Sequence, residues 1–105
     1  MSDSNVIDID NSYCTVTKKK IKEPDRYHVL LLNDDYTTMD FVVSILQKVF
    51  HKTQEEATAI MLSVHKNGLG LCGVYTQEVA ESKVTRVHFM ARAANFPLKC
   101  LMEKI

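Results

Sequence analysis

The sequence predicts an α+β domain in which a three-stranded antiparallel sheet packs against three helices, in the order β-α-α-β-α-β. Three observations predict this class. Short runs of strand-forming residues stop at turn residues. Two threonine-led helix starts each precede apolar residues at helical spacing. The last apolar residues alternate with their neighbours along the chain, as in a strand.

The first strand and the first helix follow each other closely. Residues 27–32 (Tyr-His-Val-Leu-Leu-Leu) form an apolar run that ends at Asn-Asp-Asp, which is typical of a buried strand followed by a turn. Thr37 and Asp40 then have the spacing of a capping box, with Thr37 as the expected cap. Apolar residues at 41, 42, 45, 46, 49 and 50 mark one face of a helix.

The second helix has its own start and stop signals. Residues 53–56 (Thr-Gln-Glu-Glu) form a second capping box, and Ala57, Ile60, Met61 and Val64 follow at helical spacing. Gly68 is expected just past the helix end, where glycine tolerates a left-handed backbone. The short junction at 51–52 predicts that these two helices form a hairpin.

The remaining chain predicts a strand, a helix and a strand. Residues 69–75 are strand-like but carry Gly70 and Gly73, which favours a twist or a close backbone approach. Thr76 is the expected cap of a third helix that ends near Asn95, because Pro97 cannot continue it. Its apolar stripe is narrow: Ala80, Val84, Val87, Ala91 and Ala94. Residues 98–103 alternate as the last strand.

Length and composition limit the function classes. The 105 residues fit one domain, and 13 basic residues balance 13 acidic ones. This balance argues against a nucleic-acid partner, which requires a basic excess. No apolar run approaches the roughly 20 residues that span a bilayer, and the polar start of the chain does not resemble a secretion signal. We therefore expect a soluble, cytoplasmic protein with no membrane partner.

We expect two parts, a flexible extension at 1–24 and a core domain at 25–105. The extension has acidic residues first and then a block of lysines, with few apolar residues to offset the entropy cost of ordering. Cys14, Cys72 and Cys100 are far apart and odd in number, which predicts neither a disulfide framework nor a zinc site.

Polar residues are concentrated directly after the first predicted strand. Asn33, Asp34, Asp35 and Thr37 place an amide, two carboxylates and a hydroxyl within five residues. Helix capping explains one or two of them. With Thr37 as the cap, Asn33 and Asp34 are left over, and such acceptors suit a primary ammonium ion.

Metal binding is disfavoured. A calcium loop starting at Asn33 would need Gly and Glu where Thr38 and Ser44 stand. The four histidines show no zinc-binding spacing, so we expect no metal and no cofactor. His65 falls at the end of the second helix, where capping of the helix end is the simplest role.

The run 29–42 (Val-Leu-Leu-Leu-Asn-Asp-Asp-Tyr-Thr-Thr-Met-Asp-Phe-Val) closely resembles the signature of the ClpS family, adaptor proteins of the bacterial Clp protease. Three later stretches resemble that family in order and spacing: 59–65, 68–84 and 97–100. The resemblance covers roughly residues 25–105. It implies a non-enzymatic adaptor that binds proteins with a bulky hydrophobic first residue (Leu, Phe, Tyr or Trp) and delivers them to a ClpA-type unfoldase.

The resemblance also implies roles for particular residues. Those implied to hold the α-amino group and first peptide unit are Asn33, Asp34 and His65, with Asp35 and Thr37 completing the polar rim. Those implied to form the apolar walls are Met39, Val42, Met61, Val64 and Leu98, with Met39 as a gate against β-branched residues. Those implied to dock on the N-terminal domain of the unfoldase are Glu78, Glu81 and Lys83. The extension is implied to help transfer the cargo.

One position departs from the family pattern. Thr38 stands where the family has proline, and a proline would preset the backbone at the helix start. We therefore expect a less rigid loop at the mouth of the pocket.

Two other functions stay open from the residues. A small hydrolase would use His65 with Asp34 or Cys72, but no nucleophile–base signature is present. A generic interaction module of a larger ribosomal or ubiquitin-ligase assembly is the other alternative.

Overall fold

The computed structural model describes residues 24–105, so the predicted extension at 1–24 falls almost entirely outside the described residues. The elements follow the predicted order: β1 (Arg26–Leu32), α1 (Met39–Lys48), α2 (Gln54–Asn67), β2 (Leu69–Thr76), α3 (Gln77–Ala93) and β3 (Lys99–Lys104). The predicted α+β class is confirmed.

The three strands form one antiparallel sheet in the order β2-β1-β3. The central strand β1 pairs with β2 on one side and with β3 on the other. The register with β2 shifts between Val29 and Leu30, because Val29 faces Gly73 and Leu30 faces Leu71. Cys72 is therefore the extra residue of a β-bulge, which increases the local twist of β2.

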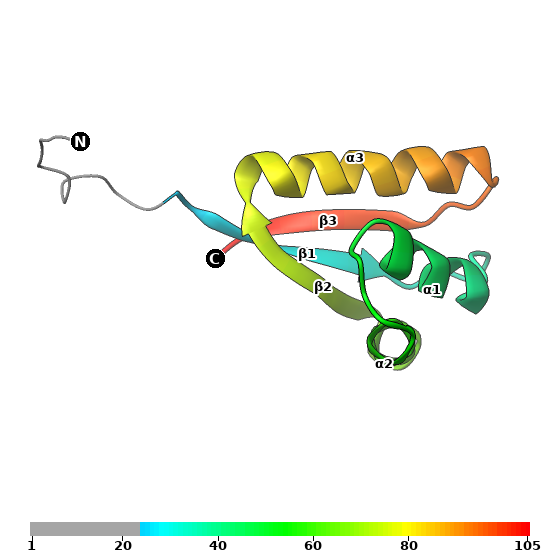
Figure 1. Cartoon of the computed structure of the whole chain (residues 1–105). Helices are drawn as coiled ribbons and strands as arrows, with labels where there is room; N and C mark the ends of the chain where they lie inside the picture. Colours follow the sequence, from blue (N-terminus) through cyan, green and yellow to red (C-terminus); the bar gives the residue numbers. More distant parts are fainter. Residues whose placement is uncertain (1–23) are drawn as a thin grey trace, which may run out of the picture.

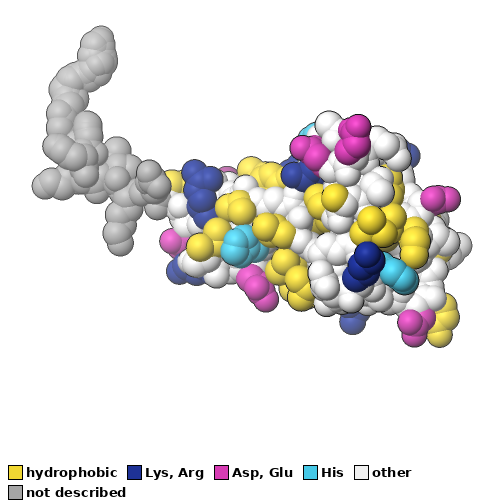
Figure 2. All heavy atoms as spheres, turned by 90° about the horizontal axis from the view of Figure 1, so that it is seen from below, with side chains coloured by type: hydrophobic (Ala, Val, Ile, Leu, Met, Phe, Trp, Pro, Cys, Tyr) yellow, Lys and Arg dark blue, Asp and Glu magenta, His cyan; other side chains and the backbone are white. Residues whose placement is uncertain are grey.

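The core lies between one face of the sheet and the helices. Side chains from all three strands point into it, among them Leu31 from β1, Cys72 from β2 and Cys100 from β3. Figure 1 shows α3 lying along the sheet and α1 at the end of β1 that is farther from the N-terminus. On the opposite face, Leu69, Leu71 and Val74 stay 40–47% exposed. Figure 2 views the molecule from below Figure 1, on the side of β2 and α2, and hydrophobic side chains are exposed on that surface.

Glycine allows α2 to approach β2 closely. A Cβ atom added at Gly70 would lie 2.7 Å from Cγ2 of Val64 and 3.0 Å from the carbonyl oxygen of Ile60. The close backbone approach predicted at this position is therefore present. It brings Val64 of α2 directly against the sheet.

The helix ends agree with the sequence in most respects. Thr53 and Glu56 form the predicted capping box of α2, and Gly68 ends that helix with φ of 89°. Thr76 is the N-cap residue of α3, but its side chain makes no capping hydrogen bond. The prediction that Thr37 caps α1 is wrong. Thr38 is the N-cap, and its hydroxyl accepts from the backbone N–H of Phe41 at 3.2 Å.

Candidate functional site

The polar loop after β1 is anchored to the end of α2. The backbone N–H of Asn33 donates to the carbonyl oxygen of Gly68 at 2.9 Å, and the N–H of Gly68 donates to the carbonyl of Val64 at 3.0 Å. These two hydrogen bonds fix the start of the loop beside the last turn of α2. Asn33 and His65, which are far apart in the sequence, are thereby brought to the same site.

Asp34 organises the rest of the loop. Its Oδ1 accepts from the backbone N–H groups of Tyr36 and Thr37 at 2.8 and 2.7 Å, and its Oδ2 accepts from the Thr37 hydroxyl at 2.8 Å. The expectation that Asp34 is left over for a ligand therefore needs correction. Thr37 is not the helix cap, and Asp34 is the side chain that satisfies the N–H groups of this turn.

The pKa of Asp34 reflects these contacts. Partial burial by itself raises the pKa of the carboxyl group, but the hydrogen bonds from Thr37 and Tyr36 outweigh it and lower the pKa below the ordinary value of 3.8. The loop therefore holds a carboxylate at neutral pH. This negative charge lies beside the amide of Asn33.

A cleft of about 410 Å³ opens between this loop, the start of α1 and the last turns of α2. Nine of the ten predicted pocket residues line it: Asn33, Asp34, Asp35, Thr37, Met39, Val42, Met61, Val64 and His65. Sequence reasoning missed one lining residue, Tyr36, whose place within the polar run was the only signal available for it. Thr38, which was expected at the mouth of the pocket, also lines the cleft.

The cleft has an apolar floor and a polar rim. Val42 and Val64 are 5% and 2% exposed and form the deepest part of the lining. Met39 is 45% exposed at the first turn of α1, and Met61 is half-buried on α2. Asn33, Asp35 and His65 are exposed at the rim. The cleft is therefore open to solvent at its polar rim, and apolar side chains form its floor.

Leu98 does not line the cleft. It is 1% exposed and belongs to the same core cluster as Val42 and Val64. The structure therefore places Leu98 in the hydrophobic core that also contains the two floor residues. Leu98 was predicted to form part of the apolar wall of the pocket, and it is not among the residues that line the cleft.

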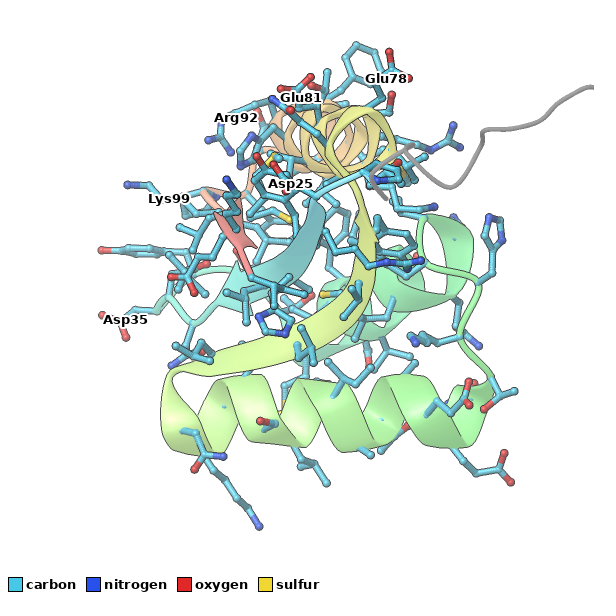
Figure 3. All side chains as sticks on the ribbon, turned by 90° about the vertical axis from the view of Figure 1, so that its left-hand side faces the viewer. Asp25, Asp35, Glu78, Glu81, Arg92 and Lys99 are labelled. Atoms are coloured by element: carbon cyan, nitrogen blue, oxygen red, sulfur yellow. The ribbon has the colours of Figure 1, made fainter. Side chains whose placement is uncertain are left out.

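The residues predicted to dock a partner separate into two groups. Glu78 and Glu81 are exposed on α3 and project from that helix on the side away from the sheet, whereas Asp35 projects from another side of the molecule (Figure 3). Lys83 instead points inward. Its Nζ donates to the carbonyl oxygen of Val49 at 2.7 Å and lies 5.7 and 5.2 Å from the ring centres of Phe50 and Tyr75.

The groups that a hydrolase or a metal site would need are poorly placed. Cys72 is fully buried, and burial raises the pKa of its thiol. Burial likewise raises the pKa of Cys100 to about 12. Across residues 24–105, no cluster of three His, Cys, Asp or Glu side chains is arranged to hold a metal ion. The same part of the chain has no helix that is long and apolar enough to cross a membrane.

Comparison with known proteins identifies the family. A sequence model described as ATP-dependent Clp protease adaptor protein ClpS matches residues 22–101. The chain belongs to the ClpS family. The ATP-dependent Clp protease adapter protein ClpS of Lawsonia intracellularis is 53% identical over 104 residues, which cover 99% of this chain and 95% of that protein. That of Oleidesulfovibrio alaskensis is 59% identical over 88 residues, covering 84% and 85%.

A solved ClpS structure has the same fold. The structure of Agrobacterium tumefaciens ClpS2 bound to L-phenylalaninamide matches with a TM-score of 0.77 and 32% sequence identity. The match covers 79% of this chain and all of that chain. Membership of the ClpS family makes this protein an adaptor of the ATP-dependent Clp protease.

Proposed function

We propose that the cleft between the loop and the first two helices binds the first residue of substrate proteins, holding the free α-amino group and a bulky hydrophobic side chain together. The observation that carries this proposal is the cleft itself, which joins exposed polar acceptors to a buried apolar floor. L-Phenylalaninamide, the ligand of Agrobacterium tumefaciens ClpS2, has both a free amino group and a bulky side chain, and this supports the proposal.

Asn33 and His65 are the groups we expect to contact the amino group and the first peptide unit directly. Both are exposed at the rim. Asp34 supplies negative charge and holds the loop through Thr37 and Tyr36. Its Oδ2 still has acceptor capacity, since a carboxylate oxygen can accept more than one hydrogen bond. Asp35 completes the acidic rim.

The first side chain would occupy the space above Val42 and Val64, between Met39 and Met61. Burying a Leu or Phe side chain contributes ~1.5–3 kcal/mol. Two or three hydrogen bonds to a charged amine add ~1.5–3 kcal/mol each. The gross total of ~5–12 kcal/mol, less the cost of immobilising a chain end, leads to micromolar affinity, which suits an adaptor that must release its cargo.

Met39 is the residue we propose as the gate against β-branched first residues. It is the first residue of α1 and remains half exposed beside the floor residue Val42. A methionine side chain is flexible enough to pack along an unbranched neighbour. A branch at the β carbon would instead be crowded against the start of α1.

Delivery requires a second surface. We propose that Glu78 and Glu81 dock on the N-terminal domain of a ClpA-type unfoldase in the cytoplasm, with residues 1–24 as the extension that helps to transfer the cargo. Lys83 would support this surface by holding α3 against the end of α1, because its ammonium group donates a hydrogen bond to the carbonyl oxygen of Val49. The adaptor would catalyse no reaction itself, and the unfoldase and protease would supply the energy and the hydrolysis.

The direct test compares three fluorescent peptides that differ only at the amino end. The first begins with Leu, the second carries an acetyl group on that Leu, and the third has Met before it. We expect micromolar binding of the first alone. Acetylation removes the positive charge and leaves the rim acceptors without a donor, and an added Met keeps the charge but moves it one residue away from the Leu side chain. Equal binding of all three would refute the proposal.

A further inference from the structure

A second cleft lies on the other side of the polar loop. Its volume is about 450 Å³, and its lining combines loop residues 33–36 with three residues that the first cleft lacks, Leu32, Pro97 and Lys99. The two clefts therefore share Asn33, Asp34, Asp35 and Tyr36 as a common wall. A chain that leaves the first cleft across this wall enters the second.

The sheet order explains why the clefts flank the loop. The loop follows the central strand β1. The first cleft lies toward α2, which leads into β2, whereas the second lies toward β3 on the other side of β1. Leu32 pairs with Lys99 across the β1–β3 ladder, so these two side chains stand next to each other at the end of the sheet.

The second cleft is mainly apolar. Leu32 and Pro97 supply hydrocarbon from the sheet end, and the ring of Tyr36, which is 74% exposed, supplies a further apolar surface. Lys99 and Asp35 project from the same side of the molecule (Figure 3). The lining carries two carboxylates, Asp34 and Asp35, against the single cation Lys99, so it disfavours an acidic side chain, and its hydrocarbon favours an apolar one.

We propose that this second cleft binds the third residue of the substrate chain and favours a large apolar or aromatic side chain there, an inference that rests on the proposed function. Successive side chains of an extended chain point to opposite sides, so the first and third residues face the same side about 7 Å apart. The two clefts share the wall formed by residues 33–36, so an extended chain that crosses this wall can place its first residue in one cleft and its third residue in the other. The second side chain would point away, toward solvent.

The test is a set of labelled peptides that all begin with Leu and are measured by fluorescence anisotropy against the full chain. The third residue is Phe, Leu or Gly, and a further peptide carries Phe at the second position with Gly at the third. We expect Phe at the third position to bind about tenfold more tightly than Gly. The same Phe at the second position should have a smaller effect.

Two variants test whether the preference for the third residue comes from the second cleft. Tyr36→Ser removes the exposed ring from the second cleft, and Phe89→Ser removes an equally exposed ring from α3, since both side chains are 74% exposed. We expect the affinity ratio between the Phe and Gly peptides to fall close to one in Tyr36→Ser. The ratio should be unchanged in Phe89→Ser.

The outcomes separate this inference from the proposed function. If Leu-initiated peptides bind and acetylated ones do not, but the third residue has no effect, the second-cleft proposal is overturned while the first-cleft proposal holds. A third-residue preference that survives Tyr36→Ser would also overturn it. If the free amino end has no effect, both proposals are wrong.

Discussion

At the scale of single residues, two side chains of the polar loop accept the backbone hydrogen bonds of two neighbouring turns. Asp34 accepts hydrogen bonds from the backbone N–H groups of Tyr36 and Thr37, and Thr38 accepts one from the first turn of α1. The φ of Thr38 is −73°, close to the value that a proline would impose. Thr38 therefore has a φ that a proline could also adopt at this position, and it adds a side-chain cap that proline cannot provide.

This division predicts different effects for two similar substitutions. Asp34→Ala removes the carboxylate that holds the loop, so we expect at least tenfold weaker binding of a Leu-initiated peptide, as for the loss of one charged hydrogen bond. Thr38→Ala removes only the helix cap and should cost ~1 kcal/mol of stability. Peptide titrations and urea unfolding of both variants measure the two effects.

The opposite pattern would contradict this assignment. If Asp34→Ala unfolded the domain while Thr38→Ala abolished peptide binding, Asp34 would be a structural cap alone. Equal peptide affinity in wild type and Asp34→Ala would show that neither the charge nor the ordered loop matters for binding.

Much of this residue detail could not be predicted from the sequence. The run 33–38 contains several residues that can cap a helix, and the choice of Thr38 over Thr37 depends on a shift of one residue in the chain path. Nine of ten pocket residues were nevertheless identified through the family resemblance. Leu98 was misplaced because alternation in a strand shows burial but not which neighbour covers the side chain.

At the scale of elements, two side chains from the middle of α3 join this helix to the rest of the fold. Nζ of Lys83 donates a hydrogen bond to the carbonyl oxygen of Val49, just past the end of α1. Unpaired carbonyl groups at a helix end attract a cation. Further along the same helix, Nε2 of His88 accepts from the backbone N–H of Cys100 at 3.0 Å. These contacts cross between segments distant in sequence, so no local pattern predicted them.

Lys83 and Glu78 should behave differently on substitution. Lys83→Met keeps most of the side-chain length but loses the hydrogen bond to Val49, so we expect a loss of ~1–3 kcal/mol of stability. Glu78→Lys lies on an exposed position and should weaken association with the unfoldase while leaving the urea midpoint unchanged. A destabilised Glu78→Lys with normal association would contradict the proposed docking face.

His88 predicts a dependence of stability on pH. Burial first, and then the charges of Arg92 and Lys99, lower the pKa of His88 below its ordinary value of 6.5. The unfolded chain therefore takes up the proton more readily than the folded chain. The stabilising contribution is complete above pH 6.5 and is lost as the pH falls through the lower pKa of the folded state.

The check is urea unfolding between pH 5 and pH 8 in wild type and His88→Gln. Glutamine can still accept from Cys100 but does not titrate. We expect wild type to lose more stability than the variant on acidification. Parallel curves would show that His88 contributes nothing to the pH dependence.

At the scale of the whole molecule, the fold separates the tasks of an adaptor. The binding cleft opens at the end of β1, and the exposed acidic residues of α3 face elsewhere (Figure 3). The proposed substrate cleft and the proposed docking face would therefore allow substrate and unfoldase to be bound together. The order of elements could be predicted because each element carries local start and stop signals. The two clefts could not be predicted in this way, because they depend on how the loop sits between β2 and β3.

A crystal structure of the protein with a short Leu-initiated peptide tests the central claim most directly. We expect the amino group beside Asn33 and His65, with the leucine side chain resting on Val42 and Val64. A cleft filled by the protein's own side chains, or a peptide bound only at another surface, would contradict the account.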